Sequence, residues 1–283
     1  MIPKRKLGKT GKMLSIVGMG GIVVMNLEQT KANSIVAEAI ERGVNYFDVA
    51  PSYGDAELKL GTALNGKRDK IFLACKTAER SREGAEKQLK ESLKQLNTDY
   101  FDLYQLHGMT TEEDFKIALG PNGALEAIIK ARDEGFVKYI GFSAHSSKIA
   151  LRLMDAFNFD TILFPINWVA MINANFGPAV IEKAKSKDIG ILAIKGMAMT
   201  LKEENDTRYP KAWYKLIENH ELAKLAFRYT LSQPVTSALP PGDESFFPIA
   251  LEVGENFTQI TKEEEKYLKE KSKGLKPIFD LDN

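Results

Sequence analysis

Residues 96–107 read Leu-Asn-Thr-Asp-Tyr-Phe-Asp-Leu-Tyr-Gln-Leu-His. The second half of this stretch, 101–107, is short, apolar and rich in aromatic residues, so it predicts a buried β-strand that ends at His107. The segment before it, 84–96, places Leu89, Leu93 and Leu96 on one face of a helix, with Lys, Glu and Gln around the rest. A helix followed by a buried strand is the repeating unit of parallel sheets.

The same unit recurs along the chain. Short apolar runs alternate with charged stretches of helical spacing, and the runs are residues 14–20, 44–50, 70–77, 101–107, 139–143, 161–167, 190–195 and 236–240. Eight repeats predict an α/β fold, a closed (β/α)8 TIM barrel that forms one domain over residues 1–283. An open dinucleotide-binding sheet is the alternative, but Gly18-Met-Gly-Gly-Ile lacks the third glycine of its motif.

The composition limits the classes of function. The formal net charge is +1, from 39 basic and 38 acidic residues, so nothing favours nucleic acid as a partner. No long apolar run follows the basic start, which argues against a signal peptide and a membrane span. Cys75 is the single cysteine and has no partner for an internal disulfide, which predicts a reducing, cytoplasmic location and a packing role.

Chemically useful side chains stand where three of the predicted strands end. Asp48 and Tyr53 end or follow the second run, Lys76 ends the third, and His107 ends the fourth. Active groups in parallel barrels lie at the C-terminal ends of the strands. We therefore expect these four residues to share one rim.

These segments resemble those of the aldo-keto reductase family. The family's Asp, Tyr, Lys, His tetrad matches Asp48, Tyr53, Lys76 and His107, and the resemblance extends over nearly the whole chain, including the opening Lys6-Leu-Gly-Lys-Thr-Gly. It implies a (β/α)8 barrel that transfers hydride between a nicotinamide cofactor, NADPH or NADH, and a carbonyl compound. The substrate would be an aldehyde or a ketone.

Elementary chemistry supports these roles. Carbonyl reduction needs an acid for the developing alkoxide, and tyrosine is a poor acid at neutral pH unless its anion is stabilised. The ammonium of Lys76 would stabilise the Tyr53 phenolate, and Asp48 would hold the charge of Lys76. His107 would donate a hydrogen bond to the carbonyl oxygen. We assign no residues to a metal.

The resemblance also implies contacts with the cofactor. Ser143 and Asn167 stand where the family holds the carboxamide, and Ile194 stands where it places an aromatic residue against the nicotinamide. Lys195, followed by Gly196, would reach the pyrophosphate or form a structural salt bridge. Gly20 and Gly21 would allow close backbone approach, or serve only as turn glycines.

The segment after the eighth run bears on the choice of cofactor. Backbone amides around Gly242, at the start of a short helix, would bind phosphate. Family members specific for NADP carry Lys and Arg in this segment, whereas this chain has Pro241 and Phe247, with Asp243 and Glu244 between them. NADPH is expected, with weak discrimination against NADH.

The sequence is also compatible with two other classes of function. One is a cofactor-binding subunit without catalysis, and the other is a lyase that forms a Schiff base through Lys76 or Lys195. The sequence does not specify the substrate, the oligomeric state or the role of His145. Candidate pocket residues are Met109, Phe176, Met197, Met199, Tyr209 and Trp213.

Overall fold

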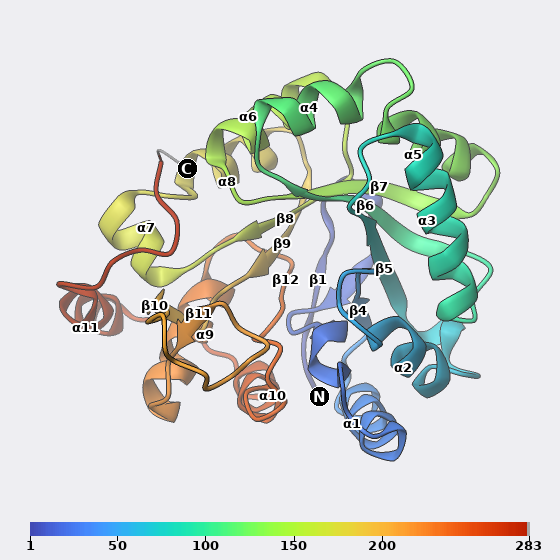
Figure 1. The fold of residues 1–283 in the computed structure, drawn as a ribbon. Helices are drawn as coiled ribbons and strands as arrows, with labels where there is room; N and C mark the ends of the chain where they lie inside the picture. Colours follow the sequence, from blue (N-terminus) through green and yellow to red (C-terminus); the bar gives the residue numbers. More distant parts are fainter. Residues whose placement is uncertain (282–283) are drawn as a thin grey trace.

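The computed structural model describes residues 1–281, and within that range eight parallel strands form one curved sheet (Figure 1). The two edge strands meet, since Val17 and Ala238 form a parallel bridge. Two backbone hydrogen bonds support it: Gly18 N donates to Ala238 O at 3.0 Å, and Ala238 N donates to Ile16 O at 2.9 Å. This closure confirms the predicted (β/α)8 barrel.

The barrel wall follows the chain order. Its strands are β3 (Met19–Gly20), β4 (Tyr46–Asp48), β5 (Phe72–Thr77), β6 (Phe101–Met109), β7 (Val137–Ala144), β8 (Thr161–Pro165), β9 (Gly190–Ile194) and β12 (Ser237–Ala238). Two antiparallel hairpins lie outside it, β1 (Lys4–Lys6) with β2 (Met13–Ser15) and β10 (Ala198–Leu201) with β11 (Tyr214–Leu216).

Helices surround the wall (Figure 1). They are α1 (Gln29–Glu41), α2 (Ala56–Ala63), α3 (Arg82–Gln95), α4 (Glu112–Leu119), α5 (Ala124–Asp133), α6 (Ser147–Ala156), α7 (Trp168–Ala174), α8 (Pro178–Ser186), α9 (His220–Ser232), α10 (Phe247–Glu255) and α11 (Lys262–Ser272). Short 3-10 turns are η1 (Gly8–Thr10), η2 (Gly21–Val24) and η3 (Arg68–Lys70). None of the helices within residues 1–281 is both long and apolar enough to cross a bilayer.

The expected first strand, 14–20, is wrong as a single element. Its first part belongs to β2, and only Met19–Gly20 forms the wall strand β3. Leu7 and Leu14, from either side of the β1–β2 turn, are buried in a cluster with Tyr46 and Phe72 inside the barrel. Residues 13–15 thus pair with β1 in a hairpin that closes the floor of the barrel, and they do not form part of the barrel wall.

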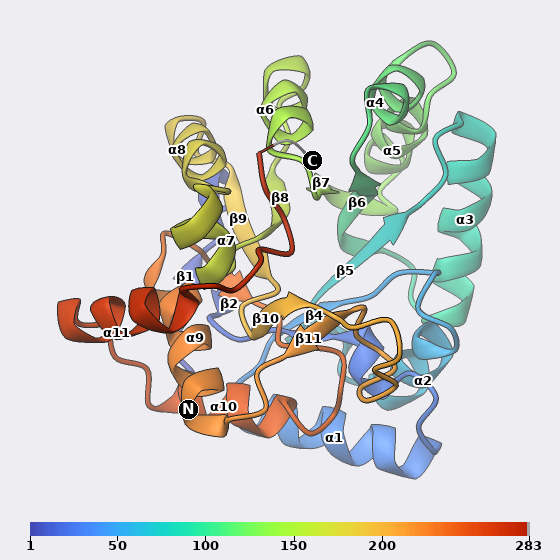
Figure 2. The same cartoon turned by 60° about the vertical axis from the view of Figure 1, so that its left-hand side comes forward.

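The loops that matter for function lie at the opposite end, where the wall strands end. The β10–β11 hairpin and the segment that follows α11 lie on this side of the molecule, and the latter runs past α7 (Figure 2). Phe279, in that last segment, packs against Phe176, Trp213 and His145, with ring centroids 5.4, 5.6 and 5.2 Å away. These two segments therefore form a roof over part of the barrel mouth.

Candidate active site

The site is built around a buried ion pair between neighbouring strands. Lys76 on β5 and Asp48 at the end of β4 have side chains that are 0% and 2% exposed, and Lys76 Nζ donates to Asp48 Oδ1. Lys76 Nζ also donates to the Val49 carbonyl at 3.2 Å. Burial alone would lower the pKa of Lys76, but the Asp48 carboxylate, with smaller contributions from Tyr53 and Cys75, holds that pKa above its ordinary value. Lys76 is thus a fixed cation at neutral pH.

Two further residues hold the other oxygen of Asp48, and the sequence analysis missed both. Tyr46 Oη donates to Asp48 Oδ2 at 2.9 Å, and Gln105 Nε2 donates to the same oxygen at 3.0 Å. Tyr46 precedes Asp48 by two positions on β4, so both side chains point to the same face. Gln105 on β6 lies in register with Lys76. The two-residue period of strands was the signal that could have found them.

Tyr53 and His107 lie next to this pair. Lys76 Nζ is 5.1 Å from the centroid of the Tyr53 ring. The rings of Tyr53 and His107 meet edge to face, with centroids 5.9 Å apart. Burial raises the pKa of the Tyr53 hydroxyl, and the positive charge of Lys76 works against that rise. The structure thus brings together the four residues predicted from the strand ends.

His107 is an uncharged imidazole at neutral pH. Burial and then the positive charge of Lys76 lower its pKa to about 3. The position of its backbone is fixed, because Arg80 Nη2 donates to the His107 carbonyl at 2.7 Å while Arg80 Nε donates to Asp114 at 2.7 Å. A neutral imidazole still carries one N–H donor.

These groups open onto a cavity of about 240 Å³ at the barrel mouth. Among the predicted residues its lining includes Gly20, Asp48, Tyr53, His107, Ser143, Ile194, Lys195 and Gly242. Residues that the sequence analysis did not assign also line it, namely Ile22, His145, Leu163, Lys211, Tyr214, Leu239 and Pro240. Of the candidate pocket residues, Trp213 lines the cavity, whereas Met109, Phe176 and Met197 are fully buried in the core.

Three predicted cofactor residues lie outside this lining. A Cβ on Gly21 would come within 2.7 Å of Val49, and one on Gly196 within 2.8 Å of Thr230, so both glycines serve close packing. Asn167 is 1% exposed. It accepts from Ala170 N and caps α7, and its amide donates to the carbonyls of Lys195 and Ala198 at 3.0 and 2.8 Å.

Lys195 occupies an unusual position at the end of β9. Its backbone is left-handed, with φ of 69°, a conformation that costs a non-glycine residue about 1–2 kcal/mol. The hydrogen bond from Asn167 helps to hold this turn. Its Nζ lies 4.6 Å from the Tyr214 ring centroid and 5.4 Å from that of Trp213.

The segment that carries Gly242 is tied to two other loops. Glu244 accepts hydrogen bonds from Lys31 at 2.9 Å and Lys211 at 3.2 Å, and Lys211 also donates to the Val23 carbonyl at 3.0 Å. Partial burial opposes ionisation of Glu244, but hydrogen bonds from Lys31, from its own backbone N–H and from Lys211 hold its pKa at about 2. Residues 242–246 form turns before α10 begins at Phe247, which is 2% exposed.

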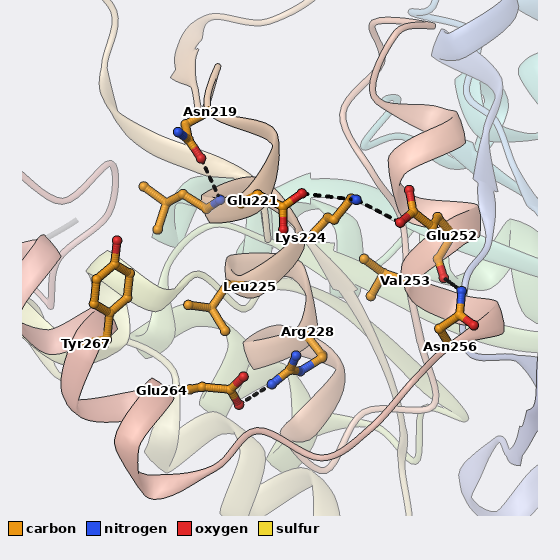
Figure 3. A pocket seen from close by; sticks show the side chains of 11 residues that line it. Asn219, Glu221, Lys224, Leu225, Arg228, Glu252, Val253, Asn256, Glu264 and Tyr267 are labelled. Carbon is orange, nitrogen blue, oxygen red and sulfur yellow. Dashed lines mark hydrogen bonds and ion pairs between the residues drawn. The ribbon is translucent and has the colours of Figure 1, made fainter.

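A larger hollow, of about 500 Å³, lies on the outer surface between α9, α10 and α11 (Figure 3). Its charged side chains pair with one another: Lys224 bridges Glu221 and Glu252, and Arg228 pairs with Glu264. It lies among helices, away from the strand ends, and leaves no charge in position to act on a ligand among these residues. Within residues 1–281, no three His, Cys, Asp or Glu side chains form a metal-binding group.

Comparison with known proteins defines the class. The model of the Aldo/keto reductase family matches residues 17–263, and this chain belongs to that family. It is 28% identical over 304 residues to the uncharacterized oxidoreductase YqkF of Bacillus subtilis (strain 168), covering 95% of this chain and 96% of that protein. The predicted class of enzyme, an oxidoreductase of the aldo-keto reductase type, is therefore confirmed.

Solved structures share the fold. The holo form of aldo-keto reductase AKR11C1 from Bacillus halodurans superimposes with a TM-score of 0.77 at 23% identity, over 98% of this chain and 99% of that one. An aldo-keto reductase from Klebsiella pneumoniae, solved in complex with NADPH, gives a TM-score of 0.75 at 17% identity, with 99% of each chain covered.

Proposed function

We propose that this protein reduces an aldehyde or ketone to an alcohol with hydride from NADPH, and that it also accepts NADH. The observation that carries the proposal is the buried Lys76–Asp48 pair beside the Tyr53 ring, with neutral His107 on the same cavity. The carbonyl carbon gains a hydride and the oxygen gains a proton, so the chain must supply an acid and orient the carbonyl.

Tyr53 is the acid in this proposal. Its hydroxyl gives its proton to the developing alkoxide, and the phenolate left behind lies close to the Lys76 ammonium. Asp48 keeps Lys76 charged, and Tyr46 and Gln105 keep Asp48 in place. His107 donates its N–H to the carbonyl oxygen and thereby stabilises the negative charge that grows there.

The cavity fits a nicotinamide cofactor. Ile194 offers an apolar wall, the Ser143 hydroxyl accepts from Gly108 N at 2.7 Å and keeps its own proton to donate, and Gly20 leaves the backbone accessible. These residues would hold the nicotinamide and its carboxamide, and Gly242 would lie towards the phosphates. The bound cofactor supplies the hydride. The related fold from Klebsiella pneumoniae was solved with NADPH, which supports the same cofactor here.

The cellular setting is part of the proposal. We place the protein in the cytoplasm as one domain acting on a small carbonyl compound, because Cys75 is a buried free thiol on the outer face of β5. Its Sγ lies 3.4 Å from Glu57 Oε1, in keeping with a packing role.

The rival functions make different demands on the lysines. A Schiff-base lyase needs a neutral amine, and the ion pair with Asp48 keeps Lys76 protonated. Lys195 is a better amine nucleophile, since burial lowers its pKa to about 8. A cofactor-binding subunit would need no acid, yet the complete tetrad lines or adjoins one cavity.

One experiment separates these functions. Purified protein is mixed with NADPH or NADH and a panel of aldehydes and ketones, and oxidation of the cofactor is followed by absorbance. We expect turnover by the wild-type protein. Cofactor binding without oxidation against any carbonyl would favour the non-catalytic subunit. A covalent adduct trapped by borohydride with substrate, without cofactor, would favour the lyase.

A further inference from the structure

The cavity contains a cation that the proposed reduction does not use. Lys195 and Lys211 both line it. Lys211 is paired with Glu244 at 3.2 Å. Lys195 Nζ has no ion pair and no hydrogen bond to any acceptor in the described part of the chain, and its contacts are with the faces of Trp213 and Tyr214. The two aromatic rings of the roof therefore position the Lys195 ammonium, and no carboxylate in the described part of the chain neutralises it.

The groups around Lys195 leave the cavity positive. Asp48 is committed to Lys76, and Glu244 to Lys31 and Lys211. His107 and His145 are uncharged at neutral pH, because burial lowers their pKa values to about 3 and about 4, with Lys195 among the lesser causes for both. The Lys195 ammonium thus faces the same space as Tyr53 and His107, and no carboxylate among residues 1–281 forms an ion pair with it.

The backbone conformation at Lys195 is a second indication that the lysine side chain has a function. The left-handed conformation favours glycine or asparagine. Asn167 donates a hydrogen bond to the Lys195 carbonyl and holds this backbone conformation. The side chain of Lys195 then places its ammonium between the end of β9 and the β10–β11 hairpin. A merely structural turn would be better served by glycine.

From this geometry we propose that Lys195 binds a carboxylate on the substrate, so that the enzyme acts on aldehydes or ketones that also carry a carboxylate. The inference rests on the proposed carbonyl reduction. A monoanion fits better than a phosphate dianion, because Lys195 is the one unpaired cation among the described residues that line the cavity. His145, which also lines it, offers a neutral imidazole as a second hydrogen-bonding group.

The test uses matched substrates. Steady-state kinetics are measured with 4-carboxybenzaldehyde and with methyl 4-formylbenzoate, its uncharged ester, and the shorter pair of succinic semialdehyde and methyl 4-oxobutanoate is run beside them. Wild-type protein should prefer each acid. Lys195→Met should lower kcat/KM for the acids by about 10- to 100-fold and leave kcat/KM for the esters within about threefold of the wild-type value. The variant should therefore lose the preference for acids over esters. Lys195→Arg should restore most of it.

Two control variants distinguish a carboxylate site from a general charge effect and from a structural lysine. Lys211→Met removes the paired lysine of the same cavity, and it should change kcat/KM for acids and for esters by the same factor. Lys195→Asn should lose the preference for acids yet raise the melting temperature by about 2 °C, because asparagine tolerates the left-handed backbone. A stability loss in Lys195→Asn together with unchanged preference would show a structural lysine and overturn the inference.

The remaining outcomes are also decisive. If Lys195→Met weakens NADPH binding and affects acids and esters equally, Lys195 serves the cofactor pyrophosphate and the inference is wrong. If the wild-type protein reduces esters and acids equally well, carbonyl reduction stands and the carboxylate site falls. If it reduces nothing, the proposed function fails; binding of 4-hydroxymethylbenzoate, compared between wild type and Lys195→Met by calorimetry, then decides the carboxylate site separately.

Discussion

At the scale of single residues, the site depends on the hydrogen bonds and the ion pair that the carboxylate of Asp48 accepts. A buried carboxylate is unfavourable unless its oxygens are paired, and Asp48 receives donors from Lys76, Tyr46 and Gln105. This arrangement gives Lys76 a permanent charge beside Tyr53 without exposing either partner to water. The acid, the cation and the carboxylate therefore act as one unit.

Removing the charge of Asp48 should destabilise the fold. Asp48→Asn leaves the buried Lys76 ammonium without a counter-ion, so the free energy of unfolding should fall by about 3 kcal/mol in urea denaturation. The matched control is Asp155→Asn, which breaks ion pairs with Lys183 and Lys187 on the exposed surface and should have little effect. Equal, small losses in both variants would mean that the Asp48–Lys76 pair contributes no more than a surface pair.

The neutral histidines make stability sensitive to acid. His107 and His145 have folded pKa values of about 3 and about 4, below the ordinary 6.5. The unfolded chain therefore binds more protons than the folded one between about pH 6.5 and about pH 4, and stability falls as the pH drops through this window, by at most about 1.4 kcal/mol per pH unit for each histidine. The melting temperature measured against pH shows this slope.

A substitution isolates the contribution of one histidine. His145→Gln should make the melting temperature fall less steeply as the pH drops from about 6.5 to about 4, because one of the two buried imidazoles is gone. His220→Gln, at the exposed start of α9, should leave the slope unchanged. The same slope in all three proteins would contradict the assignment of acid sensitivity to the cavity.

At the scale of elements, one side chain joins α7 to the turn that follows β9. Asn167 caps α7 through Ala170 N and also donates to the carbonyls of Lys195 and Ala198. The resemblance to the family assigned Asn167 to the carboxamide of the cofactor, because Asn167 stands after the matching strand. Three hydrogen bonds to backbone groups could not be foreseen, because two of them join segments about thirty residues apart.

Truncating Asn167 should cost more than losing an ordinary cap. Asn167→Ala leaves buried backbone groups unsatisfied, and the free energy of unfolding should fall by about 3 kcal/mol. Asn219→Ala removes the cap of α9, where Asn219 accepts from Leu222 N at 2.9 Å, and should cost about 1 kcal/mol. Denaturation of both variants tests the difference; equal losses would show that Asn167 acts only as a cap.

The β12–α10 segment should discriminate weakly between the cofactors. Glu244 stays ionised and neutralises Lys31 and Lys211, so neither lysine is free for a 2′-phosphate. Fluorescence titration should give a preference for NADPH over NADH below about a thousandfold, or ~4 kcal/mol. Glu244→Ala releases both lysines and should raise the preference about tenfold. A preference above a thousandfold in the wild-type protein would place the phosphate site elsewhere.

At the scale of the whole molecule, the sequence predicted the parts that depend on local pattern. The runs at 70–77 and 161–167 match β5 and β8 to within a few residues, because buried strands are short, apolar and bounded. Thr261 and Glu264 form a capping box at the start of α11, and this is also a pattern of neighbouring residues. Asp48, Tyr53, Lys76 and His107 share one rim because strand order places them there.

Features that depend on tertiary contacts were not predictable. The β1–β2 hairpin that fills the barrel floor interrupts a run that reads as one strand. Phe279, more than a hundred residues from His145 along the chain, packs on it in the roof. Met109, Met197 and Phe176 could not be told from pocket residues by composition, since an apolar side chain suits a core and a cavity equally well.

The central claim is that Tyr53 and Lys76 act together as the acid. It is tested most directly by the rate of hydride transfer in a single turnover at saturating cofactor, for Tyr53→Phe, Lys76→Met and the double variant, with cofactor affinity measured separately. Each single variant should lose about 10²- to 10⁴-fold in rate, and the double variant should be little worse, because the two residues form one unit. A near-normal rate for Tyr53→Phe would contradict the account and point to His107 as the acid.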